Sequence, residues 1–300
     1  MRRHRGRVFV LRRPAVALRA YEAALRAGPR DARVLFERDQ LWKRRGISPA
    51  RRLRALGKFP ALARTRDDLA VELCALYNQT GRPAEALRIV STRRFQPWEG
   101  GEGQALAQHA RTHLLLGRAA LARGDVPAAR RAFELALTAP ENLGEARHRL
   151  ANASELHFWL GESAAAAGDT AAARTHWSAA AACGGDFQGM SVRAFSEMTY
   201  WSALALGRLG RRADAKQRFR ALLDQARALG RAPAKIDYFA TSLPTMLLFE
   251  EDLAATQRTT ALFMEAQARL GLGERAAARR LLATVLRRDP AHAAARDLLA

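Results

Sequence analysis

Apolar residues recur every three or four positions along most of this chain, in runs that end at a glycine or an arginine. The clearest such ends are Gly81, Gly124, Gly168 and Gly273, and a second, alanine-rich run with the same spacing follows each of them. Apolar residues at this spacing form one face of a helix, so the pattern predicts pairs of helices joined by short turns. We therefore expect an all-α fold in which helical hairpins stack into a solenoid.

Two stretches carry the same order of small and large residues around the turn. The first has His113, Leu116, Gly117, Ala120, Gly124, Ala129, Phe133, Ala136 and Pro140, and the second has His157, Leu160, Gly161, Ala164, Gly168, Ala173, Trp177 and Ala180. This order resembles the tetratricopeptide repeat, in which small residues sit where two helices cross and a large residue fills the gap beside them. Further versions surround Gly81, Gly210 and Gly273, and weaker ones surround Arg12 and Gly46.

The spacing of the turns is irregular. From residue 12 to residue 273 the gaps are 34, 35, 43, 44, 42 and 63 residues, and only the first two match the usual period of about 34. Longer helices or insertions must account for the extra residues. We therefore expect residues 14–300 to form an irregular tetratricopeptide-like superhelix of about six to seven helical hairpins, with inserted segments near 93–103, 140–150, 184–195 and 230–255.

The turns have a physical basis, since glycine can adopt the left-handed conformation that ends a helix, whereas Asp or Pro begins the next one. Pro83, Asp125 and Asp169 stand where such starts are expected. By the same reasoning, Asp289-Pro290 should start a terminal helix that runs through Leu299 and caps the last hairpin.

Hydropathy predicts no membrane segment, because no run approaches the roughly 20 apolar residues that span a bilayer. The short apolar stretch Val8–Leu11 is flanked by arginines and is too short for a signal-peptide core. These features predict a cytoplasmic protein without a membrane partner. The two cysteines, Cys74 and Cys183, lie far apart in sequence and offer neither a disulfide framework nor zinc-ligand spacing.

The formal net charge of +21 is concentrated at the start of the chain. Residues 1–66 hold 20 Lys/Arg against 4 Asp/Glu, whereas residues 67–300 hold 30 against 25. We expect residues 1–13 to form a basic, poorly ordered arm. Such an arm would bind nucleic acid in a salt-dependent way, but Met1–Arg7 has no aromatic residue to stack on bases. The charge is explained equally simply by an arginine-biased composition, by a solvated tail or by an unnatural chain start. We therefore predict that nucleic acid is not the partner.

No catalytic constellation is evident, so we expect no catalytic residue, cofactor or metal site. His109 and His113 share a helix face, but no glutamate lies between them to act as the general base of a metalloprotease. The acidic run 250–252 diverges around a helix rather than converging on a ligand. The glycines at 100, 101 and 103 lack the spacing and the lysine of a phosphate-binding loop.

The remaining candidates are surfaces, and the first is the concave groove lined by the first helix of each hairpin. The repeat register assigns to this groove Asn78, Arg111, Arg118, Glu155, Phe158, Glu162, Glu197 and Tyr200. Mixed charge with two aromatics suits a protein or peptide segment: Phe158 and Tyr200 would anchor it, while Arg118 and Glu162 would select its orientation. Alternatively, the two aromatic residues pack the inserted segments. If the groove prediction holds, Arg118→Glu and Glu162→Arg should abolish partner capture.

A second candidate is a docking loop that could contact a neighbouring domain or a sugar. Its residues are Trp98, Glu99, Glu102, Lys235, Asp237 and Tyr238. A tryptophan can stack against the face of a sugar ring, although the sequence alone does not bring the two parts of this loop together.

The inserted segments also carry the most distinctive strings of the chain, which are residues 94–103, 140–148, 185–188, 198–201, 235–244 and 250–252. Together they resemble a bacterial family of large proteins, whose C-terminal repeat region follows a galactose-mutarotase-like β-sandwich domain of unknown function. The resemblance implies a carbohydrate-linked role with that domain as partner, in cis or in trans. This chain has no strand-rich segment of that kind, so no sugar-processing residue carries over to it.

The start of the chain fits the same resemblance. The helix expected over Pro14–Ala27 matches the second helix of a repeat, yet the residues before it are too few and too basic to form its partner. We therefore expect Met1 to be a shortened or internal start, or the parent to be split between genes. The sequence as a whole predicts a non-catalytic scaffold for protein association, linked to a carbohydrate-active partner. The alternative is an accessory domain that completes a carbohydrate-binding or carbohydrate-processing site.

Overall fold

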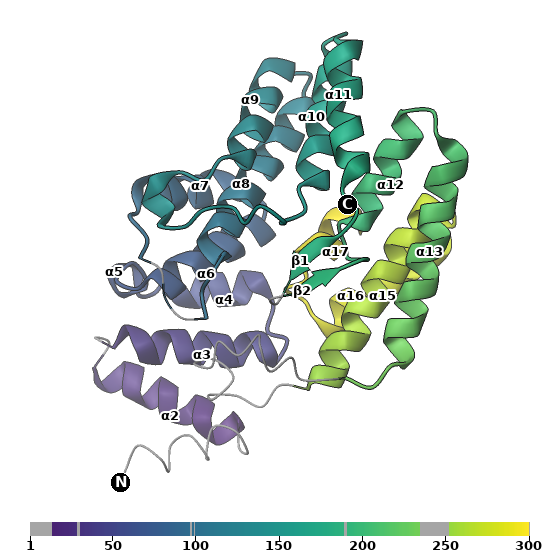
Figure 1. Cartoon of the computed structure of the whole chain (residues 1–300). Coiled ribbons are helices and arrows are strands. Elements are labelled where there is room, and N and C mark those ends of the chain that lie inside the picture. Colours follow the sequence, from purple (N-terminus) through teal and green to yellow (C-terminus); the bar gives the residue numbers. More distant parts are fainter. Residues whose placement is uncertain are drawn as a thin grey trace. The chain divides into compact units, whose positions relative to one another are not determined.

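The computed structural model describes residues 14–28, 31–96, 98, 100–188, 191–234 and 252–299. These residues form helices nearly throughout, together with one two-stranded antiparallel sheet (Figure 1). They divide into two compact units. The first takes in the described residues of 1–109, 140–145 and 241–252, and the second those of 110–139, 146–240 and 253–300. The all-α helical repeat fold is confirmed.

The first unit consists of short helices. Its elements are α2 (Pro14–Ala27), α3 (Ala32–Arg44), α4 (Pro49–Leu56), α5 (Pro60–Ala63), α6 (Asp67–Gln79), α7 (Pro83–Thr92), the first turn of α8 (Gln104–Ala122) and the 3-10 turn η1 (Glu141–Leu143). Its core is built from aliphatic side chains, and Leu35, Leu56, Leu69 and Leu76 are fully buried.

The second unit contains the remainder of α8 and the later hairpins. Its elements are α9 (Val126–Leu137), α10 (Ser154–Ala166), α11 (Thr170–Ala182), β1 (Asp186–Gln188), β2 (Ser191–Arg193), α12 (Thr199–Arg208), α13 (Arg212–Arg231), α15 (Leu253–Gly271), α16 (Arg275–Arg288) and α17 (Ala293–Leu299). From α9 to α17, each described helix packs against the next described helix along the chain. This order of contacts is the stacking that a solenoid requires.

The predicted turns are confirmed where the structure describes them. Six turn glycines have φ between 69° and 86°, the left-handed region that glycine adopts most readily, and they are Gly46, Gly81, Gly124, Gly168, Gly210 and Gly273. The Asp125 side chain accepts a hydrogen bond from the backbone of Ala128 (3.1 Å), and Asp169 accepts one from Ala172 (2.9 Å). Both aspartates therefore cap the following helix. The turn predicted at Arg12 and the basic arm over residues 1–13 lie outside the described residues.

Close helix crossings depend on the small residues singled out in the repeat. A Cβ atom added at Gly117 would lie 2.4 Å from the ring of Phe133, and one added at Gly161 would lie 2.4 Å from the ring of Trp177. No side chain fits at that distance. The small-and-large pairing that the repeat pattern predicts therefore brings the two helices of each hairpin into contact.

Long helices and inserted segments both contribute to the irregular spacing. α8 and α15 have 19 residues each and α13 has 20. The segment near 184–195 contains the β-hairpin, in which Asp186 pairs with Arg193, and the segment near 140–150 contains η1. Of the segment near 230–255, the residues from 235 to 251 lie outside the described part.

The terminal helix begins later than the sequence predicts. It starts at Ala293 rather than at Asp289-Pro290, because the Asp289 carboxylate accepts a hydrogen bond from the backbone of Ala291 (2.9 Å) and forms a turn there. His292 then accepts one from the backbone of Ala295 (3.2 Å) at the start of the helix. Ala295 is fully buried against α15 and α16, so α17 does cover the last hairpin.

A buried ion cluster occupies the core of the first unit. Arg52 is fully buried and donates hydrogen bonds to Asp39 and to Glu72, and Lys43 also contacts Glu72 (3.1 Å). Burial alone would raise the pKa of Glu72, but the charges of Lys43 and Arg52 outweigh it and lower that pKa to about 2. The two cations therefore hold Glu72 ionised inside the unit.

Within the described ranges, the structure has no helix that combines the length and the apolar character needed to cross a membrane.

Candidate protein-binding groove

Two of the predicted groove residues face the terminal helix inside the second unit. Arg111 of α8 forms an ion pair with Asp297 of α17, in which one guanidinium nitrogen, Nη2, lies 3.0 and 2.9 Å from the two carboxylate oxygens. Arg118, two turns further along α8, lies 3.7 Å from the same carboxylate. One aspartate thus faces two arginines on the face of α8 that the repeat register assigns to the groove.

Glu155 of α10 completes this set, and we call Arg111, Arg118, Glu155 and Asp297 the groove cluster. Burial raises the pKa of Glu155 to about 7, although the charges of Arg111 and Arg118 act in the opposite direction. Asp297 and Glu197 raise the pKa further. Glu155 is therefore only partly ionised near neutral pH, which leaves the two arginines with an excess of positive charge.

Hydrogen-bond donors remain unused beside the groove cluster. Arg118 lies over the ring of Trp159, 5.0 Å from its centroid. Both Nε of Arg111 and Nε1 of Trp159 are buried without a hydrogen-bond partner among the described residues. Buried donors in native proteins are nearly always paired, so each of these atoms is a position where a ligand oxygen or a water molecule would be stabilised.

Phe158 and Tyr200 lie in the hydrophobic core of the second unit. Their exposed fractions are 5% and 8%, and they belong to the cluster that includes Trp201 and Phe219. Their side chains pack between neighbouring helices, whereas the alternative that the sequence leaves open is packing against the inserted segments. Both rings are therefore mainly core residues in this conformation.

Glu162 connects three helices rather than facing solvent. It accepts a hydrogen bond from the indole nitrogen of Trp177 on α11 (3.1 Å). It also forms a two-pronged ion pair with Arg208 of α12, at 2.8 and 2.7 Å. Replacing Glu162 would therefore disturb the packing of the helices as well as any surface that it contributes to.

Glu197 and Asn78 are the remaining predicted groove residues. Burial raises the pKa of Glu197 to about 7, with a further contribution from Asp186, and its backbone carbonyl accepts a hydrogen bond from Gln267 of α15 (3.1 Å). Asn78 belongs to the first unit, where it is buried and donates to the side chain of Gln108 (3.1 Å). The structure thus brings Arg111, Arg118, Glu155 and Glu197 together within the second unit, whereas Asn78 belongs to the first.

Only part of the predicted docking loop is described. Trp98 is half-buried and packs over Gly101, where a Cβ atom would lie 1.8 Å from the indole. Glu102 is exposed, and its carboxylate accepts a hydrogen bond from the backbone of Gly100 (3.0 Å). The other four residues, Glu99, Lys235, Asp237 and Tyr238, lie outside the described residues. Whether the two parts of the loop meet therefore stays a prediction.

Asp297 and Trp159 contact the predicted groove residues Arg111 and Arg118, but the sequence did not predict them. Asp297 lies 186 positions from its partner Arg111, and no repeat register links a terminal helix to α8. Trp159 follows the assigned Phe158 directly in the sequence. It could have been predicted, because the indole N–H of a buried tryptophan needs a hydrogen-bond partner.

The described part of the chain shows no cluster of metal-ligating side chains and no disulfide. No three histidine, cysteine, aspartate or glutamate side chains there converge as metal ligands. His109 and His113 are both buried within α8. Both cysteines are free thiols.

A family model described as a tetratricopeptide repeat matches residues 9–38 and 114–186. This match supports a tetratricopeptide-repeat protein. The second matched stretch contains the C-terminal part of α8, all of α9 to α11 and the close crossings at Gly117 and Gly161. Tetratricopeptide repeats generally mediate protein–protein interaction and scaffolding, and proteins built from them are generally non-catalytic. The resemblance to a family with a galactose-mutarotase-like domain stays a prediction.

Proposed function

We propose that this chain is a non-catalytic scaffold, which binds a protein or peptide segment in the concave groove of its second unit. The observation that supports this proposal is the pair of unused buried donors, Arg111 Nε and Trp159 Nε1, beside the groove cluster. A bound segment would supply the acceptors that these atoms lack, through backbone carbonyls or a carboxylate.

The charge of the groove cluster favours an acidic ligand. Two arginines face Asp297, and Glu155 is partly protonated near neutral pH. A ligand carboxylate would compete with Asp297 for Arg118, whose own distance to Asp297 is 3.7 Å and whose side chain keeps 26% of its exposure. Arg118 is accordingly the residue through which we expect the ligand to be recognised.

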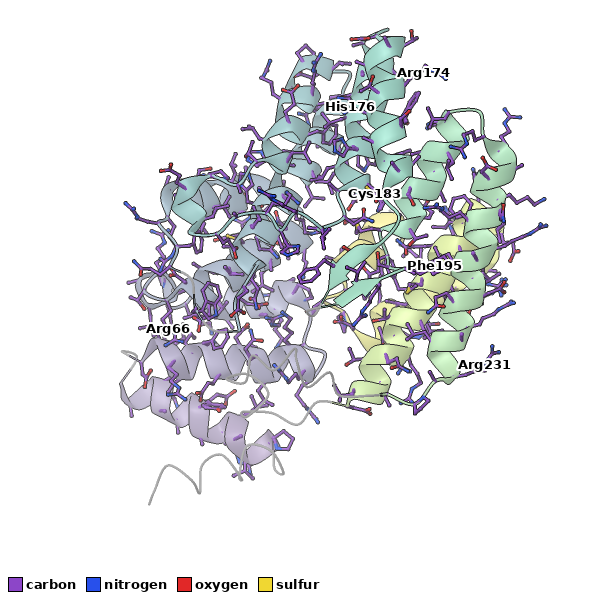
Figure 2. All side chains as sticks on the ribbon, in the orientation of Figure 1. Arg66, Arg174, His176, Cys183, Phe195 and Arg231 are labelled. Carbon is purple, nitrogen blue, oxygen red and sulfur yellow. The ribbon has the colours of Figure 1, made fainter. Side chains whose placement is uncertain are left out.

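Two substitutions with opposite expected effects test this proposal. Arg118→Gln removes the charge that a ligand carboxylate would meet, so affinity for the cellular partner should fall by about tenfold. Asp297→Asn removes the internal competitor, so the affinity should rise. Arg174→Gln is the control, because Arg174 is exposed on α11, the second helix of its hairpin (Figure 2). The affinities can be measured by titration calorimetry with the purified partner, and equal affinities in all three variants would refute the groove assignment.

We further propose that the partner is a carbohydrate-active protein, with a galactose-mutarotase-like domain in cis or in trans, in the cytoplasm of a bacterium. The support for this proposal is the resemblance carried by the inserted segments. Co-expression of this chain with such a domain from the same cell, followed by analytical ultracentrifugation, should give one complex. Two separately sedimenting species would contradict the carbohydrate link while leaving the scaffold proposal intact.

A further inference from the structure

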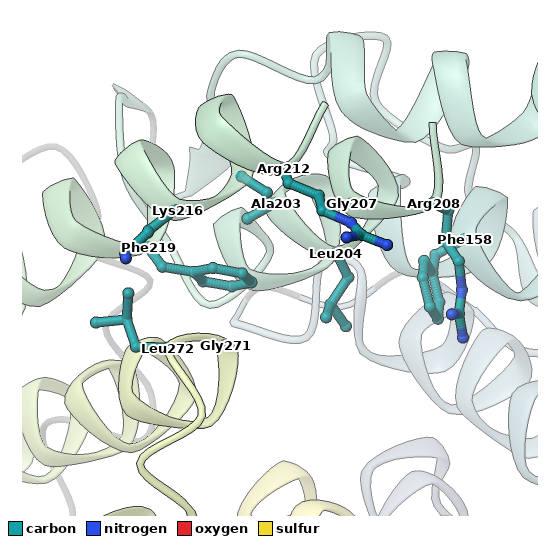
Figure 3. Close-up of a pocket in the computed structure, with 11 residues that line it drawn as sticks. Phe158, Ala203, Leu204, Gly207, Arg208, Arg212, Lys216, Phe219, Gly271 and Leu272 are labelled. Atoms are coloured by element: carbon teal, nitrogen blue, oxygen red, sulfur yellow. The ribbon is translucent and has the colours of Figure 1, made fainter. Parts of the chain in front are cut away.

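The second unit contains a pocket of about 520 Å³, formed by residues of α10, α12, α13 and α15. Its apolar part consists of Leu204, Phe219 and Leu272 together with Phe158 (Figure 3). A volume of this order is typical of pockets that hold a small ligand or a few side chains, commonly about 300–1,000 Å³. The apolar part of the pocket therefore suits an aliphatic or aromatic side chain.

Three cationic side chains surround this apolar part. Arg208 comes from the end of α12, and Arg212 and Lys216 come from the first turns of α13 (Figure 3). Arg212 and Lys216 are four residues apart, so they share one face of the helix. Both are exposed, and neither has an acidic partner among the described residues, whereas Arg208 is paired with Glu162. The rim thus carries two positive charges that the described part of the chain leaves unneutralised.

Gly207 lines the pocket, and its missing side chain leaves open space there. Gly207 lies inside α12, and a Cβ atom added there would meet no atom within 4 Å. By contrast, a Cβ atom at Gly271, which also lines the pocket, would lie 2.2 Å from Phe219. Gly271 is required for packing, while Gly207 opens onto the pocket.

We propose that this pocket is a docking site for an acidic peptide segment, in which an apolar side chain of leucine or phenylalanine size is flanked by carboxylates. The apolar side chain would occupy the space beside Gly207, and the carboxylates would meet Arg212 and Lys216. The site shares none of the four residues of the groove cluster and does not depend on the groove being a binding site.

Fluorescence anisotropy tests the proposal with the full chain and a short labelled peptide in which one phenylalanine is flanked by two glutamates. The peptide should bind saturably. The double variant Arg212→Glu/Lys216→Glu and the single variant Gly207→Phe should each weaken binding by about tenfold or more, which corresponds to about 1.4 kcal/mol. Gly207→Phe fills the pocket without a clash at Cβ, and circular dichroism would confirm that the variant remains helical.

Matched controls separate this site from general attraction to a basic protein. Arg220→Glu/Arg227→Glu makes the same change of charge on exposed positions of α13 outside the pocket and should bind the peptide as the wild type does. Arg118→Gln should also leave this binding unchanged, so failure here and failure of the groove proposal are distinguishable. A peptide with glutamine in place of glutamate should bind at least about tenfold more weakly.

Several outcomes would overturn the proposal. These are no binding by the wild type, equal losses in the two charge-reversal variants, full binding by Gly207→Phe, or equal binding of the glutamine peptide. Displacement of the peptide by a single-stranded oligonucleotide of the same charge, with equal affinity, would point to a polyanion site instead.

Discussion

Arg52 holds two carboxylates inside the first unit, and removing its side chain would leave both of them without their buried cation. It is fully buried, and it contacts Asp39 and Glu72 at the same time. Breaking a buried ion pair from one side typically costs about 3–5 kcal/mol. Arg52→Ala should therefore lower the free energy of unfolding by roughly that amount in a urea titration. Arg54→Ala, at an exposed position on the same helix, is the control, and equal losses in both variants would show that the cluster contributes nothing specific.

Glu155 makes the stability of the second unit depend on pH. Its pKa in the folded chain is about 7, raised from an ordinary value of 4.5 by burial, while Arg111 and Arg118 oppose this shift and Asp297 and Glu197 add to it. Between pH 4.5 and 7 the folded state holds the proton more strongly than the unfolded state does. Rising pH therefore reduces stability across this window, and the reduction is complete above pH 7.

Glu155→Gln removes this effect because glutamine stays neutral. The midpoint of thermal unfolding of the variant, relative to that of the wild type, should rise between pH 4.5 and 7 and then level off. A difference that stays constant over this range would contradict the raised pKa.

At the scale of the helix, the close packing of the hairpins that contain Gly117 and Gly161 requires a glycine where the two helices cross. Gly117→Ala would place a methyl group against the ring of Phe133, and overpacking of this kind costs roughly 1–3 kcal/mol. Gly207→Ala is the matched control, since it is also helical but has open space at Cβ, and it should leave stability unchanged or raise it by up to about 1 kcal/mol. Differential scanning calorimetry of both variants checks this prediction, and similar losses in the two would contradict it.

Most helices follow directly from the sequence, because turn glycines and helical periodicity are local signals. The helix expected over Pro14–Ala27 and the caps at Asp125 and Asp169 are observed as predicted. The β-hairpin was not predicted, since strands of three residues are too short to show an alternating pattern. The late start of α17 depends on the side chain of Asp289 bonding within a turn, a contact that competes with helix formation.

The groove was harder to predict than the helices that form it. Arg111, Arg118 and Glu155 follow from the repeat register, but their pairing with Asp297 depends on how the second unit closes on itself. Phe158 and Tyr200 illustrate a second limit. A helix packed between two neighbours is apolar on more than one face, so periodicity does not distinguish a surface anchor from a core residue.

At the scale of the whole molecule, several basic side chains near the start of the chain are paired with acidic side chains or buried. Among residues 14–66, Arg33 pairs with Glu37 (2.8 Å), Lys43 with Glu72, and Arg66 with Asp68, while Arg52 is buried. These charges are engaged within the protein.

We expect retention on heparin to depend in part on residues 1–13, which hold six arginines. Removing them should lower the salt concentration needed for elution, because fewer counterions are released on binding. Unchanged retention of the shortened chain would place the basic site elsewhere.

Site-specific photo-cross-linking in cells tests whether the second unit binds its partner through the groove. A photoreactive amino acid placed at Leu115, which is half-buried and lies one helical turn from both Arg111 and Arg118, would report on the groove. The same group at Arg174 on α11 would report on the second helix of a hairpin. We expect a cross-linked partner from position 115, in an amount that Arg118→Gln reduces, and none from position 174. Equal cross-linking from both positions, or cross-linking from position 174 alone, would contradict it.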